Sequence, residues 1–560
     1  MKNLAESKVL KLLILVTLVA NAFGMVCPVL ISGDANLYAA VSRHMALHND
    51  WMNLYAEGAD WLDKPHFPFW MSAACFKVLG ISAASFIFSG FVFHLVGGYY
   101  TYKLARQFYG EGTALLAALV YFTTLHLVLS TIDVRAEVFL TGLIMPACYY
   151  WLRFDETAKA RYLLAGAAFT ACAIMTKGIF VLVTIGSGLA CRWAYRRQWR
   201  QCFRLKWLLA LLLCFVFILP ELIALYAQFD AHPEKVVFGH QGVSGLRFFF
   251  WDSQFGRFFN TGPIRNQHGS PFFYLHTFLW SFLPWTVAFL GAVFSAVRSW
   301  PRGEPGDQSA AVFLYGSFLI PFVMFSATKF QFDYYLDILL PFAGIISAKY
   351  LHDALGGGTG HSWLPVIQQA FSVGLLGGIL VLSLLAVQRN LFLAFTIVLC
   401  VAVLASAFRT RRAESLFRAV ILPALAVIAV FVFVATVFEV SVLRHEASHG
   451  ITSYLRRQPR LPVYLLDMDN NEARLIQRME MQGDLVYTKL NNMEQAKALA
   501  GSFYLVAEES KLPSIQAVFP SGTVLCKVDR LEIQHFDRAY RVQTAWPTPF
   551  TRMAIVRLPN

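Results

Sequence analysis

The chain has 560 residues, of which 57% are hydrophobic, 15% aromatic and only 14% charged. Soluble globular chains have roughly 45–50% apolar and about 25% charged residues, so this composition excludes an ordinary soluble protein and indicates a polytopic membrane protein. The formal net charge is +13, but the basic residues lie mostly between apolar runs, which excludes the basic soluble face of a nucleic-acid-binding protein.

Apolar segments long enough to cross about 30 Å of hydrocarbon recur from the N-terminus to about residue 441. The first segment resembles a signal peptide, but its apolar run is long enough to span and no small-residue cleavage site follows it. We therefore expect it to be a transmembrane helix. About thirteen spans are predicted, near residues 9–31, 83–104, 112–131, 136–152, 162–176, 178–195, 206–226, 273–297, 310–326, 334–352, 363–387, 390–408 and 416–441.

Lys and Arg residues concentrate in every second connection between these spans, for example in 192–206 and 409–418. The short connections of the other set contain little more than Arg135, Lys177, Lys329 and Arg389. Because basic loops stay on the cytoplasmic side, the N-terminus is expected in the cytoplasm. With an odd number of spans, the C-terminus is expected to face outward.

Three segments are predicted to lie outside the membrane: two long outward loops at about 32–82 and 227–272, and a tail from about 442. In the tail, helix-like stretches such as Asn471–Gln482 and Met493–Ala500 alternate with apolar strand-like runs. The runs lie at Val463–Leu466, Leu485–Leu490, Phe503–Ala507, Thr523–Val528 and Ala554–Leu558. The sequence therefore predicts a membrane domain over 1–441 and a small soluble α/β domain over 442–560, large enough to fold alone.

Ionisable residues gather at the predicted outer ends of the spans. They occur in the segments 33–38, 61–70, 133–137, 176–178 and 329–335. Polar residues at span ends are ordinary, and a Lys or Arg there usually extends to the interface. Here, however, carboxylates and cations are mixed on one rim. That mixture suits a reaction on a phosphate-bearing substrate, because Lys and Arg bind phosphate and an Asp can act as a base.

Two other classes of function are open. Residues 445–449 read His-Glu-Ala-Ser-His and match the H-E-x-x-H zinc-protease motif, but no third ligand is evident. We interpret this segment preferably as the start of a juxtamembrane helix. A transporter or flippase of lipid-linked sugars would need polar residues and broken helices near the middle of the bilayer, whereas the charges here cluster at one rim.

An ordered series of short motifs extends over roughly residues 30–345. It contains Asp34 ahead of a Tyr-Ala segment, Asn49-Asp50-Trp51, Asp63-Lys64-Pro65-His66, Asp133, Thr176-Lys177-Gly178, Pro284-Trp285-Thr286, and a run of Ser326, Lys329, Tyr335 and Pro341. This series resembles the GT-C glycosyltransferases of the protein O-mannosyltransferase and lipid A aminoarabinose transferase type. The many spans followed by an outward α/β tail resemble the aminoarabinose branch.

The resemblance implies inverting transfer of one sugar from a polyprenyl-phosphate donor to an acceptor at the periplasmic face of the bacterial inner membrane. The acceptor is lipid A, another envelope glycolipid or a protein. Asp34 would be the lead catalytic carboxylate and Asp133 the supporting one. The donor phosphate would be bound by Lys64, Arg135, Lys177, Lys329 and Arg257. Further residues expected in the substrate site are Tyr38, Asp63, His66, Glu137 and Tyr335.

Three positions depart from the family pattern. His66 replaces the second Pro of an acidic-Lys-Pro-Pro element, Asp63 stands where Glu is usual, and Gln254 stands about where a His often occurs. If that His helps to bind a divalent metal in relatives, the metal site of this chain needs other ligands. The candidates are Asp63, His66 and His268, although nothing in their spacing specifies a site.

Overall fold

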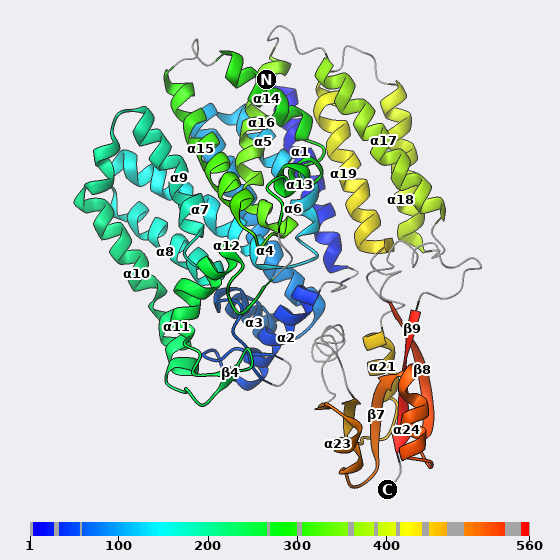
Figure 1. The fold of residues 1–560 in the computed structure, drawn as a ribbon. Helices are drawn as coiled ribbons and strands as arrows, with labels where there is room; N and C mark the ends of the chain where they lie inside the picture. Colours follow the sequence, from blue (N-terminus) through cyan, green and yellow to red (C-terminus); the bar gives the residue numbers. More distant parts are fainter. Residues whose placement is uncertain are drawn as a thin grey trace.

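The computed structural model describes residues 4–26, 28, 33–56, 59–265, 269–299, 305–356, 363–385, 390–409, 415–438, 447–466, 487–531 and 550–558. A bundle of helices forms the larger part of the molecule, and a five-stranded sheet follows near the C-terminus (Figure 1). The predicted class, a polytopic helical membrane protein with a small C-terminal α/β unit, is confirmed.

Each predicted span coincides with one helical element or with consecutive ones. They are α1 (Leu4–Asn21) with η1 (Ala22–Met25), α4 (Ala83–Tyr109), α5 (Glu111–Phe122) with α6 (Leu125–Leu129), α7 (Ala136–Thr157), α8 (Ala160–Lys177), α9 (Val181–Tyr195), α10 (Leu205–Leu225), α13 (Phe273–Ser281) with α14 (Thr286–Ser299), α15 (Pro305–Ala327), η6 (Asp333–Ile338) with α16 (Leu340–Leu355), α17 (Trp363–Leu385), α18 (Leu391–Arg409), and η7 (Phe417–Ile421), α19 (Leu422–Phe433) and η8 (Val434–Phe438).

The number of spans stays a prediction. Within the described residues, seven helices are long and apolar enough to cross a membrane, and the pair α13 and α14 would add one broken span. That pair coincides with the span predicted near 273–297, but it bends by 117° at a break that contains Pro284, which lacks a backbone N–H. Helix α5 is only 12 residues long. Because it packs between α4 and α16, protein rather than lipid surrounds it.

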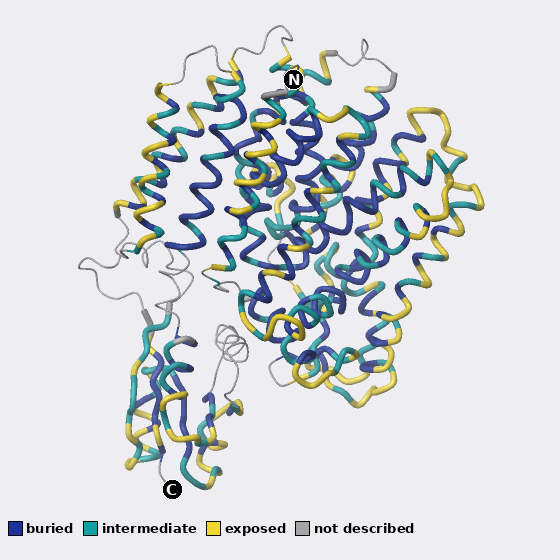
Figure 2. The backbone as a smooth tube through the Cα atoms, turned by 180° about the vertical axis from the view of Figure 1, so that it is seen from behind, coloured by how far each residue is buried: buried dark blue, intermediate teal, exposed yellow. Residues whose placement is uncertain are grey.

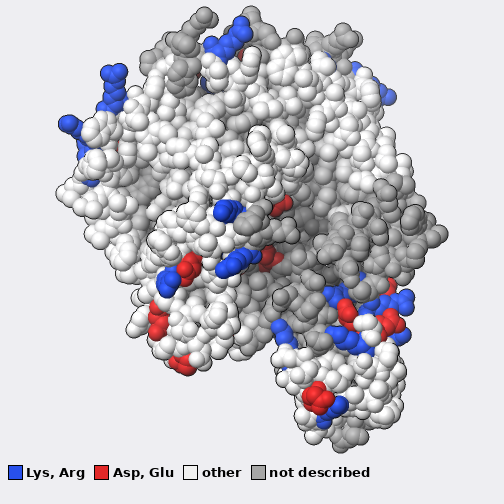
Figure 3. All heavy atoms as spheres, viewed as in Figure 1, with Lys and Arg blue, Asp and Glu red and all other residues white. Residues whose placement is uncertain are grey.

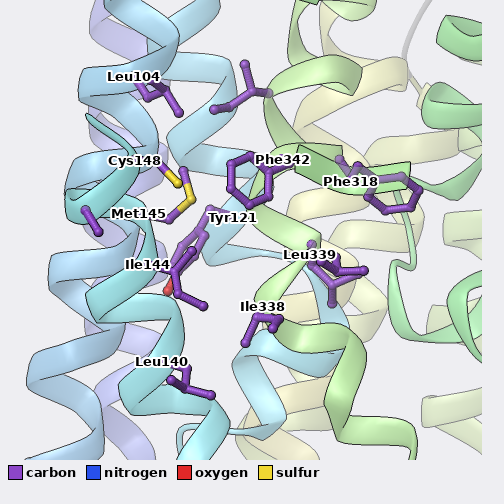
Figure 4. Close-up of a cluster of buried hydrophobic side chains, with 14 of the residues drawn as sticks. Leu104, Tyr121, Leu140, Ile144, Met145, Cys148, Phe318, Ile338, Leu339 and Phe342 are labelled. Atoms are coloured by element: carbon purple, nitrogen blue, oxygen red, sulfur yellow. The ribbon is translucent and has the colours of Figure 1, made fainter. Parts of the chain in front are cut away.

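The interior of the bundle is tightly packed around α4, α5, α7 and α16. Tyr121, Ile144 and Phe342 lie together there and are fully buried (Figure 4). Gly142 lets α7 approach α4 closely, because a Cβ at this position would lie 2.4 Å from the carbonyl oxygen of Phe93. This packing fixes the start of α7, which carries Glu137, and the start of α16, which directly follows η6 and its Tyr335.

Apolar side chains are exposed along α10, α17 and α18, as expected for helices that face lipid. Figure 2 shows exposed residues on the outer helices and buried ones in the interior. On the face shown in Figure 3, charged residues gather toward the two ends of the bundle and leave an uncharged band between them. The chain is therefore a multi-pass membrane protein.

The two predicted outward loops form structured elements at the end of the bundle away from the N-terminus (Figure 1). They contain α2 (Gly33–His48), β1 (Tyr55–Ala56), β2 (Ala59–Asp60), α3 (Phe67–Leu79), β3 (Val236–Val237), β4 (His240–Gln241), α11 (Gly245–Arg247), η4 (Phe248–Gly256) and α12 (Arg257–Phe259). The side chain of Gln228 joins the loops, because it accepts from the Leu54 N–H at 2.8 Å and donates to the Leu54 carbonyl at 2.9 Å.

The C-terminal sheet has the strand order β6-β5-β7-β9-β8. Its strands are β5 (Val463–Leu466), β6 (Tyr487–Leu490), β7 (Phe503–Glu508), β8 (Thr523–Leu531) and β9 (Phe550–Leu558). Strand β5 pairs in parallel with β6 and β7, whereas β9 runs antiparallel to β7 and β8. The five predicted apolar runs fall on these strands. The helix expected at 471–482 and the proposed boundary at 441 lie outside the described residues.

Candidate active site

The predicted site residues come from six segments that meet at the end of the bundle carrying α2 and α3. Tyr335, in η6, shows this convergence best. Its hydroxyl interacts electrostatically with groups from four other segments, namely Arg257, Glu137, Asp63 and Asp34.

Asp34 lies in the first turn of α2, where the helix dipole favours a carboxylate. Its side chain is 47% exposed, and Arg135 Nε lies 4.0 Å from Oδ2. The Tyr334 hydroxyl donates to the same oxygen at 3.3 Å. Arg135 also binds Asp133 at 2.6 Å and stacks over the Tyr334 ring, 4.2 Å from its centroid. The two predicted catalytic carboxylates therefore share one guanidinium.

Asp63 holds two of the predicted phosphate-binding cations together. Its Oδ2 lies 2.6 Å from Lys64 Nζ, and Arg257 donates both to Oδ1 and, at 3.2 Å, to the Asp63 carbonyl. Burial alone would raise the pKa of the Asp63 carboxyl, but Arg257 and Lys64 outweigh it and lower this pKa to about 2. The carboxylate thus stays charged and keeps both cations in place.

Lys177 ends α8 and binds Glu137, a buried carboxylate in the first turn of α7. Its ammonium also lies 3.6 Å from the centroid of the Tyr335 ring. Lys177, Lys64 and Arg257 line a hollow of about 300 Å³, a volume that includes space open to solvent, so these three predicted cations do converge.

His66 does not face the site as expected. Its backbone N–H donates to Glu221 Oε2 and its Nδ1 to Glu221 Oε1, both at 3.0 Å, while Nε2 contacts the Met52 carbonyl at 3.1 Å. Both His66 and Glu221 are completely buried. The structure therefore places His66 in a buried hydrogen-bonded pair with Glu221, a residue assigned no role from sequence, rather than against a substrate or metal.

No group of three His, Cys, Asp or Glu side chains that could hold a metal occurs in the part of the chain that the structure describes. Asp63 contacts Lys64 and Arg257 instead. The third candidate ligand, His268, and the residues His445 and Glu446 of the H-E-x-x-H segment lie outside the described residues.

Two residues predicted to belong to the site, Lys329 and Tyr38, make fewer direct contacts with its charged side chains. The Lys329 side chain is exposed, and the contacts that fix this residue are made by its backbone, which donates to the Phe258 carbonyl at 3.1 Å. Tyr38 is 4% exposed and packs edge-on against Phe69. Its hydroxyl interacts electrostatically with Asp34, Asp63, Glu137 and Arg257, so it lies among the charges but is covered.

Two larger hollows flank the Glu137–Lys177 pair. The first, here called the apolar hollow, measures about 650 Å³ and includes space open to solvent. Its walls are mostly apolar, from Phe180, Val181, Phe258, Met324, Phe325, Phe330 and Ile338, and Lys177 and Arg257 also line it. An apolar cavity with cations in its lining suits a lipid chain that ends in a phosphate.

The second, here called the carboxylate hollow, measures about 600 Å³, again including open space. It is lined by His126, Leu129, Ser130, Asp133, Arg135, Glu137, Val138, Trp280, Asp333, Tyr334 and Asp337. Arg135 therefore belongs with the carboxylates, across the Glu137–Lys177 pair from Arg257. Of the five cations predicted to bind one phosphate, the structure groups Lys64, Lys177 and Arg257.

His126, Asp337 and Trp280 were missed by the sequence interpretation. His126 and Asp337 fall within two of the predicted spans, 112–131 and 334–352. Ionisable residues inside a predicted span are functional candidates by default, and this signal would have found both.

Gln254 explains one departure from the family pattern. Its amide donates to the Lys177 carbonyl at 3.0 Å, and its Oε1 accepts from the Phe180 N–H at 3.3 Å. Gly178 between them has φ +101°, and a Cβ there would lie 2.0 Å from the Gln254 amide nitrogen. Gln254 thus fixes the turn that presents Lys177, a role that requires no metal.

Comparisons with known proteins show which proteins this chain resembles. A family model described as dolichyl-phosphate-mannose-protein mannosyltransferase matches residues 63–223. The chain is 27% identical over 333 residues to the undecaprenyl phosphate-alpha-4-amino-4-deoxy-L-arabinose arabinosyl transferase of Edwardsiella ictaluri, covering 58% of this chain and 56% of that protein. The protein of the same name from Pseudomonas paraeruginosa is 27% identical over 372 residues, covering 63% and 59%. The predicted resemblance to the GT-C glycosyltransferases is confirmed.

The fold comparison extends over almost the whole chain. ArnT from Cupriavidus metallidurans bound to undecaprenyl phosphate superimposes with a TM-score of 0.72 at 18% identity, covering 97% of each chain. The apo form gives a TM-score of 0.73 at 17% identity. This chain therefore has the GT-C fold of ArnT, although its sequence matches span little more than half the length of the curated relatives.

Proposed function

We propose that this GT-C protein transfers one sugar from a polyprenyl-phosphate donor to an acceptor at the periplasmic face of the inner membrane. The observation that carries the proposal is the separation of charge across the Glu137–Lys177 pair. Cations line the apolar hollow, carboxylates line the other, and Asp34 borders the second through Arg135 and Tyr334. The names of the relatives, which specify an undecaprenyl-phosphate-linked sugar, support the same donor class.

The donor binds with its polyprenyl chain in the apolar hollow and its phosphate at Lys177, Arg257 and Lys64. Asp63 and Glu137 hold these cations in position before the donor arrives. As the glycosidic bond breaks, its electron pair passes to the phosphate oxygen. Fixed cations stabilise the charge that develops there without a reorganisation of solvent.

The acceptor oxygen attacks the anomeric carbon from the face opposite the phosphate, which inverts the configuration. The new bond forms between the acceptor oxygen and that carbon while the bond to phosphate breaks. When the acceptor is a hydroxyl, Asp34 takes its proton. When the acceptor is a phosphate, it is already anionic, and Asp34 with Arg135 orients it. Lipid A, another envelope glycolipid and a protein all remain in the proposed acceptor class.

The orientation belongs to this proposal. The structured loops, the site and the C-terminal sheet lie at one end of the molecule, and α1 begins at the other (Figure 1). The connections rich in Lys and Arg belong to the same end of the molecule as the start of α1. This supports a cytoplasmic N-terminus and a periplasmic C-terminus.

The test compares cells that contain the wild-type protein, Asp34→Asn, or no copy of the gene. Mass spectrometry of lipid A, other envelope glycolipids and secreted proteins should show one sugar mass lost from one class in both altered strains. Asp307→Asn is the matched control, because Asp307 is a 57% exposed carboxylate at the other end of the bundle. Normal sugar transfer by a well-inserted Asp34→Asn protein would contradict the catalytic role of Asp34.

A further inference from the structure

The carboxylate hollow keeps a negative charge after its ion pairs are formed. Asp133 pairs with Arg135, Glu137 with Lys177, and Asp337 with His126. Asp333, in the first turn of η6, has no comparably close cationic partner among the described residues. Its carboxylate is 45% exposed, and the one ion-pair distance found for it among the described residues is 4.0 Å, to His126 Nε2.

His126 is held so that one ring nitrogen faces this hollow. The residue is 8% exposed, and its Nδ1 binds Asp337, which also accepts a hydrogen bond from the Ser130 hydroxyl. Its ring packs edge-on against Trp280, with centroids 5.1 Å apart. In the part of the chain that the structure describes, Nε2 makes no hydrogen bond, and Asp333 at 4.0 Å is beyond hydrogen-bond distance.

We propose that Asp333 and His126 Nε2 form the subsite that binds the sugar of the donor, with Asp337 as a positioning residue for His126. This inference rests on the proposed function. Asp333 Oδ1 accepts from the Tyr334 N–H at 2.9 Å, while its Oδ2 lies beside the open ring nitrogen of His126 in a cavity that Trp280 also lines. An indole side chain in the lining offers apolar contact to the C–H groups of a sugar ring, while the polar pair binds its substituents.

The charge of the subsite makes it selective. Of its lining groups, Asp133, Glu137, Asp333 and Asp337 are acidic, whereas Arg135 and His126 are basic. Because the acidic groups outnumber the basic ones, the donor phosphate binds in the apolar hollow with Lys177 and Arg257 rather than in the subsite. A protonated amine on the sugar gains a charge-assisted hydrogen bond from Asp333 that a neutral hydroxyl does not. Asp333 is therefore a specificity-determining residue.

The experiment measures the affinity of the purified full-length protein for three probes. They are polyprenyl phosphate without a sugar, polyprenyl phosphate carrying an aminodeoxypentose, and polyprenyl phosphate carrying the corresponding neutral pentose. The wild type should bind the amino donor about tenfold or more tightly than the neutral donor. Asp333→Asn should lose this preference and bind the sugar-free lipid as the wild type does.

Two further variants test the positioning role. His126→Gln should weaken both sugar-bearing donors and leave the sugar-free lipid unaffected. Asp337→Asn should reproduce that loss, and the double variant should be no weaker than either single one, since both act through the same ring. Glu234→Gln is the control, because Glu234 is a 69% exposed carboxylate in the second outer loop.

The outcomes separate the two proposals. If the wild type does not bind sugar-free polyprenyl phosphate, the donor assignment itself fails. If it binds all three probes but Asp333→Asn keeps the amine preference, or weakens all three equally, the subsite inference is overturned while the transferase function stands. Additive losses in His126→Gln and Asp337→Asn would overturn the positioning role of Asp337.

Discussion

Lys177 has two roles that mutation can separate: the proposed contact with the donor phosphate and the ion pair with the buried Glu137. Lys177→Ala removes the proposed phosphate contact and also leaves Glu137, whose side chain is 3% exposed, without its Lys177 partner. We expect this variant to lose about 3 kcal/mol of stability and to raise the donor KM roughly tenfold to a hundredfold. Adding Glu137→Gln should restore much of the thermal stability but none of the donor affinity. Recovery of donor affinity in the double variant would contradict the phosphate contact.

Asp63 gives a prediction that depends on pH. Its pKa is lowered to about 2 in the folded protein, below the usual 3.8. A carboxyl with a lowered folded-state pKa stabilises the protein above its unfolded-state pKa, and this stability is lost as pH falls toward about 2. The melting temperatures of wild type and Asp63→Asn should therefore differ by a constant amount from pH 8 to about pH 5 and converge below about pH 4. A difference that shrinks between pH 8 and pH 6 would show that another group is responsible.

At the residue scale, the sequence indicated which side chains belong to the site better than it indicated which side chains they contact. Lys177 and Asp34 were placed at the outer rim because hydropathy and basic connections define that rim. The His66–Glu221 pair could not be predicted, since its members are 155 positions apart and neither carries a local signal of the other. The two hollows were equally hidden, because each is lined by residues from several distant segments.

At the scale of elements, the His66–Glu221 pair fastens the start of α3 to the end of α10. This contact fixes the loop that carries Asp63 and Lys64. Glu221→Gln should keep the hydrogen bond from the His66 N–H but weaken the contact with the His66 ring, with a loss of about 1–3 kcal/mol of stability. Glu221→Leu leaves His66 without a partner and should cost more, about 3–5 kcal/mol. Both can be measured by thermal unfolding in detergent. An equal loss in the two variants would show that the hydrogen bond kept by Glu221→Gln contributes nothing to stability.

Elements that hydropathy defines were predicted well, and elements that tertiary contacts define were not. The five strand-like runs of the tail coincide with the strands of the sheet, because their apolar residues are buried on it. By contrast, the span expected near 273–297 is two bent helices, and the one near 112–131 is α5 followed by the short α6. Hydropathy averages over such breaks, although Pro284 marks the first.

At the scale of the whole molecule, two natural cysteines can test the orientation. Cys202 is exposed in the connection between α9 and α10, and Cys526 is partly exposed on β8 of the C-terminal sheet. If the N-terminus is cytoplasmic, a membrane-impermeant maleimide should modify Cys526 in intact spheroplasts and Cys202 only after lysis. Peptide mass spectrometry identifies each modified site, and Cys526→Ser and Cys202→Ser remove the respective signals. Modification of Cys202 before lysis would show that the topology is the reverse of the proposed one. The site would then lie on the cytoplasmic side, which is incompatible with a periplasmic acceptor.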